Sequence, residues 1–229
     1  MTYGLGRRPL PKDERDFSVR RIPQLQETTT TRKFWSMGGP DMRLDQGQTG
    51  TCQGQAWTNW LIAGPITHPD FPAFSDADTA EAFARQLYLD ATGDATLEQG
   101  AYTRQILKVL TQRTWIGAYY RCSSVDEIVQ TILTVGPVCH GSSWFNSMFD
   151  PVSEYENSYL RVDEASGVAG GHEYLLSAVN LAPAEGPPYV RVENSWGGSW
   201  AHNGCARISI DDLRVLFVGD AYVCSESVF

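Results

Sequence analysis

The spacing of apolar residues changes near residue 137, and this change constrains the fold more than any other feature of the sequence. Between residues 52 and 136, apolar side chains recur every three or four positions, which is the period of an amphipathic helix. After residue 137, short runs rich in Val, Ile, Leu and Tyr are bounded by Gly, Pro and Asn, as is typical of strands. Helices followed by strands indicate an α+β fold in two lobes with a cleft between them.

This pattern divides the chain into an extended N-terminal arm at residues 1–43, a helical lobe at 44–137 and a β-rich lobe at 138–229. Helices are predicted to begin at Cys52, Asp78, Tyr102 and Ser124. Asp78 and Ser124 are each followed by Glu three residues later, which is the spacing of a capping box. Strands are predicted at residues 138–142, 172–181, 189–195 and 205–210.

The composition argues against several classes of partner. The chain has a formal net charge of −9 and only 18 Lys and Arg residues, whereas a nucleic-acid binder usually has a basic surface. No apolar run approaches the length of about 18 residues that spans a bilayer, and the N-terminal residues lack the apolar core of a signal peptide. The five cysteines form no regular framework, so we expect reduced thiols in a cytoplasmic setting.

Three short segments contain the residue types that nucleophilic catalysis requires. They are Gln46–Cys52 before the first predicted helix, Gly170–His172 at the start of a predicted strand, and Asn194–Trp200 at the end of another. A thiol at a helix N-terminus faces unpaired backbone N–H groups and the positive end of the helix dipole, and both favour the thiolate. Cys52 is therefore the candidate nucleophile, and a nearby imidazolium of His172 would stabilise its thiolate further.

Two more residues have roles that this chemistry needs. Attack on a carbonyl group creates an oxyanion, which the backbone N–H of Cys52 and the side-chain amide of Gln46 could stabilise. Two intervening glycines let the chain turn back, so that the Gln46 side chain can reach Cys52. Asn194 would accept a hydrogen bond from the other imidazole nitrogen of His172 and so hold the orientation of the ring.

These residues resemble the papain-like cysteine peptidases, which share a Gln six residues before the nucleophilic Cys, a later His that opens a strand, and an Asn-Ser-Trp-Gly stretch. The match is residue by residue at Gln46, Gly47, Cys52, His172, Asn194, Ser195, Trp196 and Gly197, and it continues at Trp200, Asn203 and Gly204. His172 and Asn194 follow Cys52 by 120 and 142 residues, and papain-type enzymes have spacings of about 130–150. The resemblance covers residues 40–215. It implies the papain-like two-lobe fold, with a helical N-terminal lobe, an antiparallel β C-terminal lobe and the active site in the cleft between them.

The resemblance also implies residues that bind the substrate. Gly100, Glu173 and Trp196 match such positions. In the family, the position of Glu173 lies beside the pocket for the second residue before the cleaved bond, so a carboxylate there would favour Lys or Arg in the substrate. Trp196 is expected to cover the hydrogen bond between His172 and Asn194 in addition to packing within its lobe.

Some positions depart from the common pattern of the family. Thr49 and Gln53 stand where the family commonly has a Cys and a Trp, so a usual disulfide is missing and one wall of the cleft is altered. The segments Leu97–Tyr102 and Arg15–Phe17 look more like those of bacterial and phage members than those of plant or lysosomal ones. The N-terminal arm either has a structural role or lies over the cleft.

The expected function is the hydrolysis of peptide or amide bonds through a Cys-His-Asn triad and an acyl-enzyme, with a peptide or protein as substrate and without a cofactor. Two alternatives remain: acyl transfer to an amine by the same triad, as in a ligase, and a non-enzymatic structural role, for example in a virion. His140 is the alternative base, although it follows a helix rather than pairing with an Asn-bearing strand. No Cys-x-x-Cys or His-x-x-x-His spacing occurs, so no metal site is expected.

Overall fold

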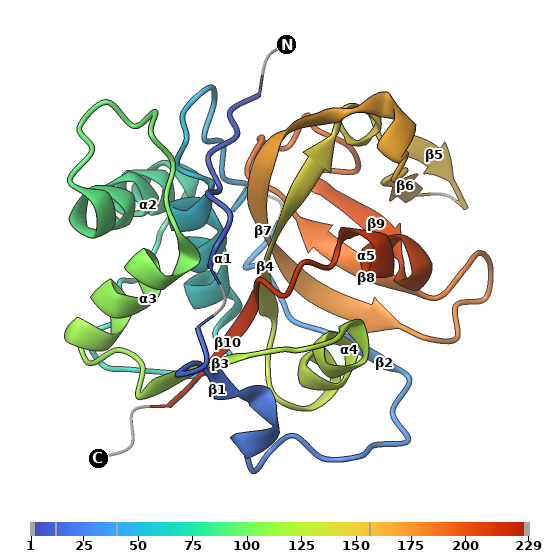
Figure 1. Cartoon of the computed structure of the whole chain (residues 1–229), viewed down its shortest axis with the longest axis horizontal. Coiled ribbons are helices and arrows are strands. Elements are labelled where there is room, and N and C mark those ends of the chain that lie inside the picture. Colours follow the sequence, from blue (N-terminus) through green and yellow to red (C-terminus); the bar gives the residue numbers. More distant parts are fainter. Residues whose placement is uncertain (1–2, 12, 40, 156, 227–229) are drawn as a thin grey trace.

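Ten strands form one mixed sheet that lies between two groups of helices (Figure 1). The computed structural model describes residues 3–11, 13–39, 41–155 and 157–226. The strands are β1 (Phe17–Ser18), β2 (Arg32–Phe34), β3 (Ala118–Arg121), β4 (Val138–Phe145), β5 (Val152–Glu154), β6 (Asn157–Tyr159), β7 (Val168–Asn180), β8 (Tyr189–Glu193), β9 (Cys205–Ser209) and β10 (Ala221–Ser225). Their order in the sheet is β1-β3-β10-β4-β7-β8-β9-β6-β5, and β2 also pairs with β7. The pairs β1–β3 and β6–β9 are parallel, and the others are antiparallel.

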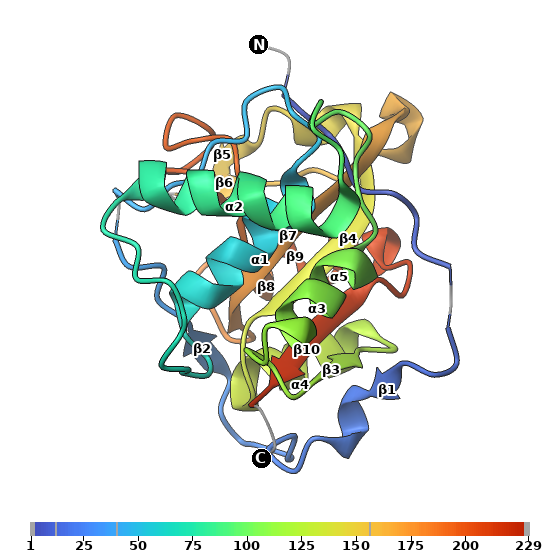
Figure 2. The ribbon, with the colours of Figure 1, turned by 90° about the vertical axis from the view of Figure 1, so that its left-hand side faces the viewer.

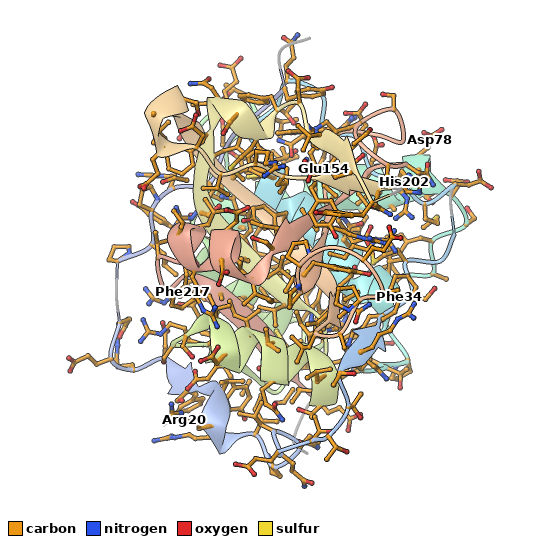
Figure 3. The ribbon with its side chains drawn as sticks, turned by 90° about the vertical axis from the view of Figure 1, so that its right-hand side faces the viewer. Arg20, Phe34, Asp78, Glu154, His202 and Phe217 are labelled. Atoms are coloured by element: carbon orange, nitrogen blue, oxygen red, sulfur yellow. The ribbon has the colours of Figure 1, made fainter. Side chains whose placement is uncertain are left out.

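The helices cover both faces of the sheet. They are α1 (Cys52–Ala63), α2 (Ala77–Thr92), α3 (Thr103–Gln112), α4 (Val125–Thr134) and α5 (Ile210–Leu216), with short 3₁₀ turns η1 (Val19–Arg21), η2 (Asn146–Met148) and η3 (Glu164–Ser166). Figure 2 shows α1, α2 and α3 in front of the sheet, and Figure 3 shows α4 and α5 on the opposite side, where Phe217 follows α5. None of the described helices is both long enough and apolar enough to cross a membrane.

The central strands bury different side chains on their two faces, since successive residues of a strand point to opposite sides. Cys139 of β4 and Leu175 of β7 join an apolar cluster with α1 and α3. Their neighbours Val138 and Leu176 join a second cluster with α4, α5, β8 and β9. The predicted α+β class is confirmed, although α4, from the range assigned to the helical lobe, packs in the second cluster.

Side-chain caps set the starts of two helices. α4 begins where predicted, because the Ser124 hydroxyl accepts a hydrogen bond from the backbone N–H of Glu127 at 3.2 Å. The predicted cap of α2 at Asp78–Glu81 is wrong, because the helix begins earlier in the chain. There the Asp76 carboxylate accepts from the Thr79 N–H at 2.8 Å, and the Thr79 side chain completes the capping box.

Strand β7 begins at Val168, so His172 lies inside the strand. The sequence had suggested that His172 stands at the start of the strand. The pair Gly170 and Gly171 is atypical of a strand, yet both residues pair with β4. A Cβ atom at Gly171 would lie 2.2 Å from the carbonyl oxygen of Arg7, so only glycine permits the approach of the N-terminal arm. The close approach of the arm therefore explains the glycine in this strand. Such glycines are the reason why the sequence did not predict the strand here.

The N-terminal segment runs along both groups of helices and contains only β1, η1 and β2 among its described residues (Figure 1). Arg104 of α3 donates to both carboxylate oxygens of Asp16, at 2.9 and 2.5 Å, and the hydroxyl of Tyr222 donates to the same carboxylate at 2.7 Å. Further along, Arg20 pairs with Glu127 of α4, and β2 adds to the edge of β7. The arm is thus anchored on both groups of helices.

Helices α1 and α2 cross closely at Gly54. A Cβ atom at this position would lie 2.2 Å from the carbonyl oxygen of Ala84. We expect Gly54→Ala to lower the free energy of unfolding by about 1–3 kcal/mol, because the two helices must move apart. Urea denaturation of both proteins, followed by circular dichroism, measures this change. In an open helix the same substitution gains about 1 kcal/mol, so an unchanged or higher stability would contradict the close crossing.

Candidate active site

Cys52 is the first residue of α1, and its side chain is fully buried. Its thiol donates a hydrogen bond to Oε1 of Gln53 at 3.3 Å. Burial raises the pKa of the thiol to about 12, with a contribution from the charge of Glu173, and the backbone N–H groups of Glu173 and Gly6 oppose this rise only in part. The sulfur is therefore a neutral thiol in this state, although it lies at a helix N-terminus.

His172 and Asn194 are hydrogen-bonded to each other. Its Nε2 lies 2.7 Å from Oδ1 of Asn194, and the backbone N–H of Ser195 donates to the same oxygen at 2.8 Å. The Ser195 N–H identifies this atom as the amide oxygen, so Nε2 must carry the proton. Nδ1 then holds the lone pair of the neutral ring, and this buried atom has no hydrogen-bond partner among the described residues.

The environment of His172 also favours its neutral form. Burial lowers the pKa of the imidazole to about 4, and the hydrogen bond to Asn194 opposes this only in part. The ring of Trp196 stacks on that of His172, with centroids 4.8 Å apart, and the edge of Trp144 meets it at 5.0 Å. The side chains of Trp144, Trp196 and His172 are all buried. That Trp196 shields the His172–Asn194 bond from water stays a prediction.

Gln46 is held in a single orientation by residues of both lobes. Its Oε1 accepts a hydrogen bond from the Ser195 hydroxyl at 2.6 Å, and its backbone N–H donates to the Ser195 carbonyl at 2.8 Å. Its Nε2 donates to the carbonyl oxygens of Thr49 at 2.7 Å and Gly4 at 3.1 Å. The Gly4 carbonyl oxygen thus occupies the place where Gln46 would bind an oxyanion.

Residues 4–8 of the arm run between the loop at Ala101 and strand β7 (Figure 1). The backbone N–H of Ala101 donates to the Gly6 carbonyl, and the Ala101 carbonyl accepts from the Arg8 N–H, both at 2.9 Å. This is the pattern of two parallel strands. The arm therefore adds a short strand to the wall formed by the helical lobe.

Strand β7, on the opposite side of the arm, binds it as well. The backbone N–H of Arg7 donates to the Gly171 carbonyl at 2.9 Å. Glycines make this fit possible, because a Cβ atom at Gly6 would lie 2.0 Å from the Gly50 oxygen, and one at Gly100 would lie 2.0 Å from the Gly6 oxygen. Gly100, a predicted substrate-binding residue, here binds the chain's own backbone.

Asp94 fixes the loop that carries Gly100, and the sequence analysis did not assign it to the site. Its buried carboxylate accepts hydrogen bonds from the backbone N–H groups of Thr96, Glu98 and Gln99, all at 3.0 Å. The hydroxyls of Thr96 and Tyr88 also donate to it. The bonds from Thr96 and Gln99 hold the pKa of Asp94 below its usual value. A short Asp-x-Thr turn after a helix was the only signal in the sequence.

Gln53 is the second residue that the sequence did not assign to the site. It replaces the Trp that is common in the family, and its side chain is fully buried. While its Oε1 accepts from the Cys52 thiol, its Nε2 donates to the carbonyl oxygens of Gly6 at 3.1 Å and Ala101 at 2.7 Å. Gln53 thus connects the nucleophile, the arm and the loop after Gly100.

Glu173 lies next to His172, but its side chain points toward α1 and α3. It accepts from Nε1 of Trp57 at 2.9 Å and from the Thr103 hydroxyl at 2.5 Å. Burial raises the pKa of its carboxyl group to about 8, and the nearby charge of Asp220 contributes to the rise. Glu173 therefore carries a proton at neutral pH and is not exposed to solvent.

This shift predicts how stability depends on pH. Because the pKa of Glu173 in the folded state, about 8, exceeds its ordinary value of 4.5, its contribution to stability is complete below pH 4.5 and is lost as the pH rises to about 8. The substitution Glu173→Gln removes this titration.

We expect the melting temperature of Glu173→Gln to equal that of the wild type near pH 4.5 and to exceed it near pH 8. The sign of the difference follows from the raised pKa, and each 1 kcal/mol corresponds to about 2–4 °C in a domain of this size. Calorimetry across this pH range measures it, with the exposed Glu98→Gln as the matched control. A difference that does not vary with pH would contradict the shift.

The other residues considered from the sequence lie outside the group formed by Cys52, His172, Asn194 and Gln46. Nδ1 of His140 lies 3.0 Å from the Tyr174 hydroxyl, and burial lowers the pKa of His140 to about 3. All five cysteines are free and buried. In the described part of the chain, no group of three or more His, Cys, Asp or Glu side chains is arranged to hold a metal ion.

Comparisons with known proteins identify the fold. No protein-family model and no curated protein matches the sequence. Among solved structures, xylellain, a cysteine protease from Xylella fastidiosa, aligns over 98% of this chain and 97% of its own, with a TM-score of 0.72 and 16% identity. Procathepsin B S9 from Trypanosoma congolense aligns over 99% and 87%, with a TM-score of 0.70 and 12% identity. Bromelain from Ananas comosus, solved with the E64 inhibitor, aligns over 86% and 99%, with a TM-score of 0.64 and 13% identity.

The chain therefore has the fold of the papain-like cysteine proteases, as its sequence motifs implied. At identities of 12–16%, the likeness concerns the fold alone. The activity has to be argued from the chain's own residues.

Proposed function

We propose that this chain is a cysteine peptidase that hydrolyses peptide bonds with Cys52 as nucleophile, His172 as base and Asn194 as the residue that orients it. The observation that carries the proposal is the fixed tautomer of His172, whose Nε2–H is bound by Asn194 and whose Nδ1 is left free. The next residue of the same strand, Glu173, directs its backbone N–H at the Cys52 sulfur. A free basic nitrogen thus lies on the strand that borders the thiol.

The reaction follows from these positions. Nδ1 of His172 takes the proton of the Cys52 thiol, and the thiolate attacks the carbonyl carbon of the substrate. The developing oxyanion is bound by the backbone N–H of Cys52 and by Nε2 of Gln46. The imidazolium then gives its proton to the leaving amine, and an acyl-enzyme remains. Water, activated by the same imidazole, releases the acid and restores the thiol.

The arm must leave before this reaction can start. Gly4 occupies the Gln46 donor, and burial under the arm keeps both Cys52 and His172 neutral. The arm also runs from the oxyanion donor toward Gly171, next to the expected pocket for the second residue before the cleaved bond. The arm therefore blocks the cleft.

Labelling of the thiol tests the proposal directly. The full chain and its Gly6→Val variant are treated with an epoxysuccinyl probe, and the modified cysteine is mapped by mass spectrometry. A side chain at residue 6 clashes with Gly50, so the arm should be displaced. If this strain is about 1.4 kcal/mol or more, Cys52 should react at least about tenfold faster in Gly6→Val.

Two controls accompany the labelling. Pro9→Ala, at an exposed position of the same arm, should leave the rate unchanged, and Cys52→Ala should abolish labelling. Modification of a different cysteine, or an unreactive Cys52 in Gly6→Val, would refute the proposed nucleophile and would favour a structural role. Assays with and without an added amine separate hydrolysis from acyl transfer.

Gln46 should act on the transition state. We expect Gln46→Ala to reduce kcat by about 10²–10³-fold with little change in KM, because the amide binds charge that develops only during attack. Steady-state kinetics in the Gly6→Val background measures both constants. The control is Gln48→Ala, because this neighbouring side chain is exposed. An unchanged kcat in Gln46→Ala, or a larger loss in the control, would remove Gln46 from the mechanism.

A further inference from the structure

One end of the sheet carries a row of arginine and aromatic side chains that the proposed peptidase function does not use. The row follows the register across strands β2, β7, β8, β9 and β6, and consists of Phe34, Ala178, Arg191, Arg207 and Tyr159. Because register partners on neighbouring strands point to the same face of a sheet, these side chains lie side by side. Val190 and Val192, the neighbours of Arg191, point to the other face and join the core with α4 and α5.

The middle of this row is hollow. Ala178 and Asn180 of β7 are short side chains between β2 and β8, and a cavity of about 240 Å³ opens beside them. We call it the basic groove, formed by Arg32, Phe34, Tyr189, Arg191, His202 and Arg207. Phe34 and His202, which are exposed, are labelled in Figure 3. The described residues that line the groove include no Asp or Glu and no residue of the candidate active site.

Two of these arginines lie where charge repulsion opposes folding. Arg191 and Arg207 are direct partners in the antiparallel pair β8–β9, and like charges directly opposite each other destabilise a sheet. Glu193 does not balance both, because its carboxylate is already shared by Arg191 at 3.1 Å and Arg43 at 3.0 Å. Among the described residues, neither Arg207 nor Arg32 has an ion-pair partner. The groove therefore holds positive charge that the chain does not neutralise locally, although its formal net charge is −9.

The arrangement of the rings favours carboxylates over nucleobases as ligands. The guanidinium carbon of Arg207 lies 4.3 Å from the ring centroid of Tyr189, and that of Arg191 lies 5.0 Å from the ring centroid of Phe34. A ring face covered by a guanidinium group cannot stack on a base. The guanidinium group itself still directs N–H donors outward in its plane, and these match the two oxygens of a carboxylate.

The size of the groove favours a short acidic segment over a long polyanion. At physiological ionic strength, charges interact over about 8 Å, so a short segment in the groove is affected mainly by the local arginines. A long polyanion would also meet the negative charge carried by the rest of the molecule. An extended peptide directs alternate side chains to one side, so alternating acidic residues would all face the groove.

We propose that the basic groove binds an acidic peptide segment of a partner protein, with Arg207 and Arg32 donating to its carboxylates. This role goes beyond the proposed peptidase function and does not depend on it, because no residue of the groove takes part in the chemistry at Cys52.

Two labelled peptides of about ten residues test the proposal. One alternates glutamate with serine, and the other alternates glutamine with serine. The protein is full-length Cys52→Ala, which lacks the proposed nucleophile, so the peptides stay intact. Fluorescence anisotropy should show the glutamate peptide binding at least about tenfold more tightly at low salt, and the difference should shrink as salt is added. Equal affinities, or a difference that salt does not change, would overturn the proposal.

Three substitutions locate the binding. In the same background, Arg207→Gln and Arg32→Gln should each weaken binding of the glutamate peptide about three- to tenfold, since each removes one charged donor. Lys108→Gln, an exposed position on α3, removes the same charge elsewhere and should leave the affinity unchanged. If Arg207→Gln does not fold, Arg32→Gln, at an exposed position of β2, decides alone. An equal loss in Lys108→Gln, or no loss at the groove, overturns the proposal.

Competition separates the acidic peptide from other anions. Inorganic phosphate, oligothymidylate and the unlabelled glutamate peptide are each added to the complex with the labelled glutamate peptide. The unlabelled peptide should displace its labelled copy at the lowest concentration. Displacement at a lower concentration by phosphate or by oligothymidylate would assign the groove to a different ligand and overturn the proposal. All of these measurements are made without the Cys52 thiol, so their outcome is independent of whether the chain cleaves peptides.

Discussion

The pairing of the arm's backbone with both walls of the cleft sets the state of every functional group inside it. Ala101 binds the arm from the helical side and Gly171 binds it from the sheet side, so water is excluded between them. Loss of water raises the pKa of Cys52 and lowers that of His172, which opposes formation of the thiolate–imidazolium pair. The helix N-terminus and the hydrogen bond that His172 donates to Asn194 favour that pair, but in this state desolvation is the larger effect.

The rigidity of the site comes from connections between the lobes beneath the arm. Gln46 precedes α1, yet its side chain and backbone are bound by Ser195 at the end of β8. The backbone N–H of Gly197 donates to the Leu44 carbonyl at 3.0 Å, which ties the same two segments a second time. The side chain of Asn194 is fixed by the backbone N–H of Ser195, the same residue that binds Gln46. Gln46 and Asn194 are therefore held by one shared network of hydrogen bonds.

The sequence was sufficient where a function requires a residue type at a fixed distance along the chain. The Asn194-Ser195-Trp196 stretch led to the pairing of Asn194 with His172, and these two side chains are hydrogen-bonded. It was insufficient where a role depends on a partner far away in the chain. Asp220 precedes a short strand without any motif, and only the fold brings it to Arg7. Likewise, the sequence does not show which face of β7 carries the Glu173 side chain, because this depends on the register of the strand. Its direction away from the cleft was therefore missed.

Two buried ion pairs hold the arm, and they differ in what can replace them. Asp16 pairs with Arg104 outside the cleft, where a substrate does not compete, so this contact keeps residues 4–8 near the cleft at a high effective concentration. Arg7 pairs with Asp220 inside it. Breaking a buried pair by removing one partner costs about 3–5 kcal/mol, because the other charge is left without compensation. To leave the cleft, residues 4–8 would have to break the Arg7–Asp220 pair, whereas the pair at Asp16 could stay intact.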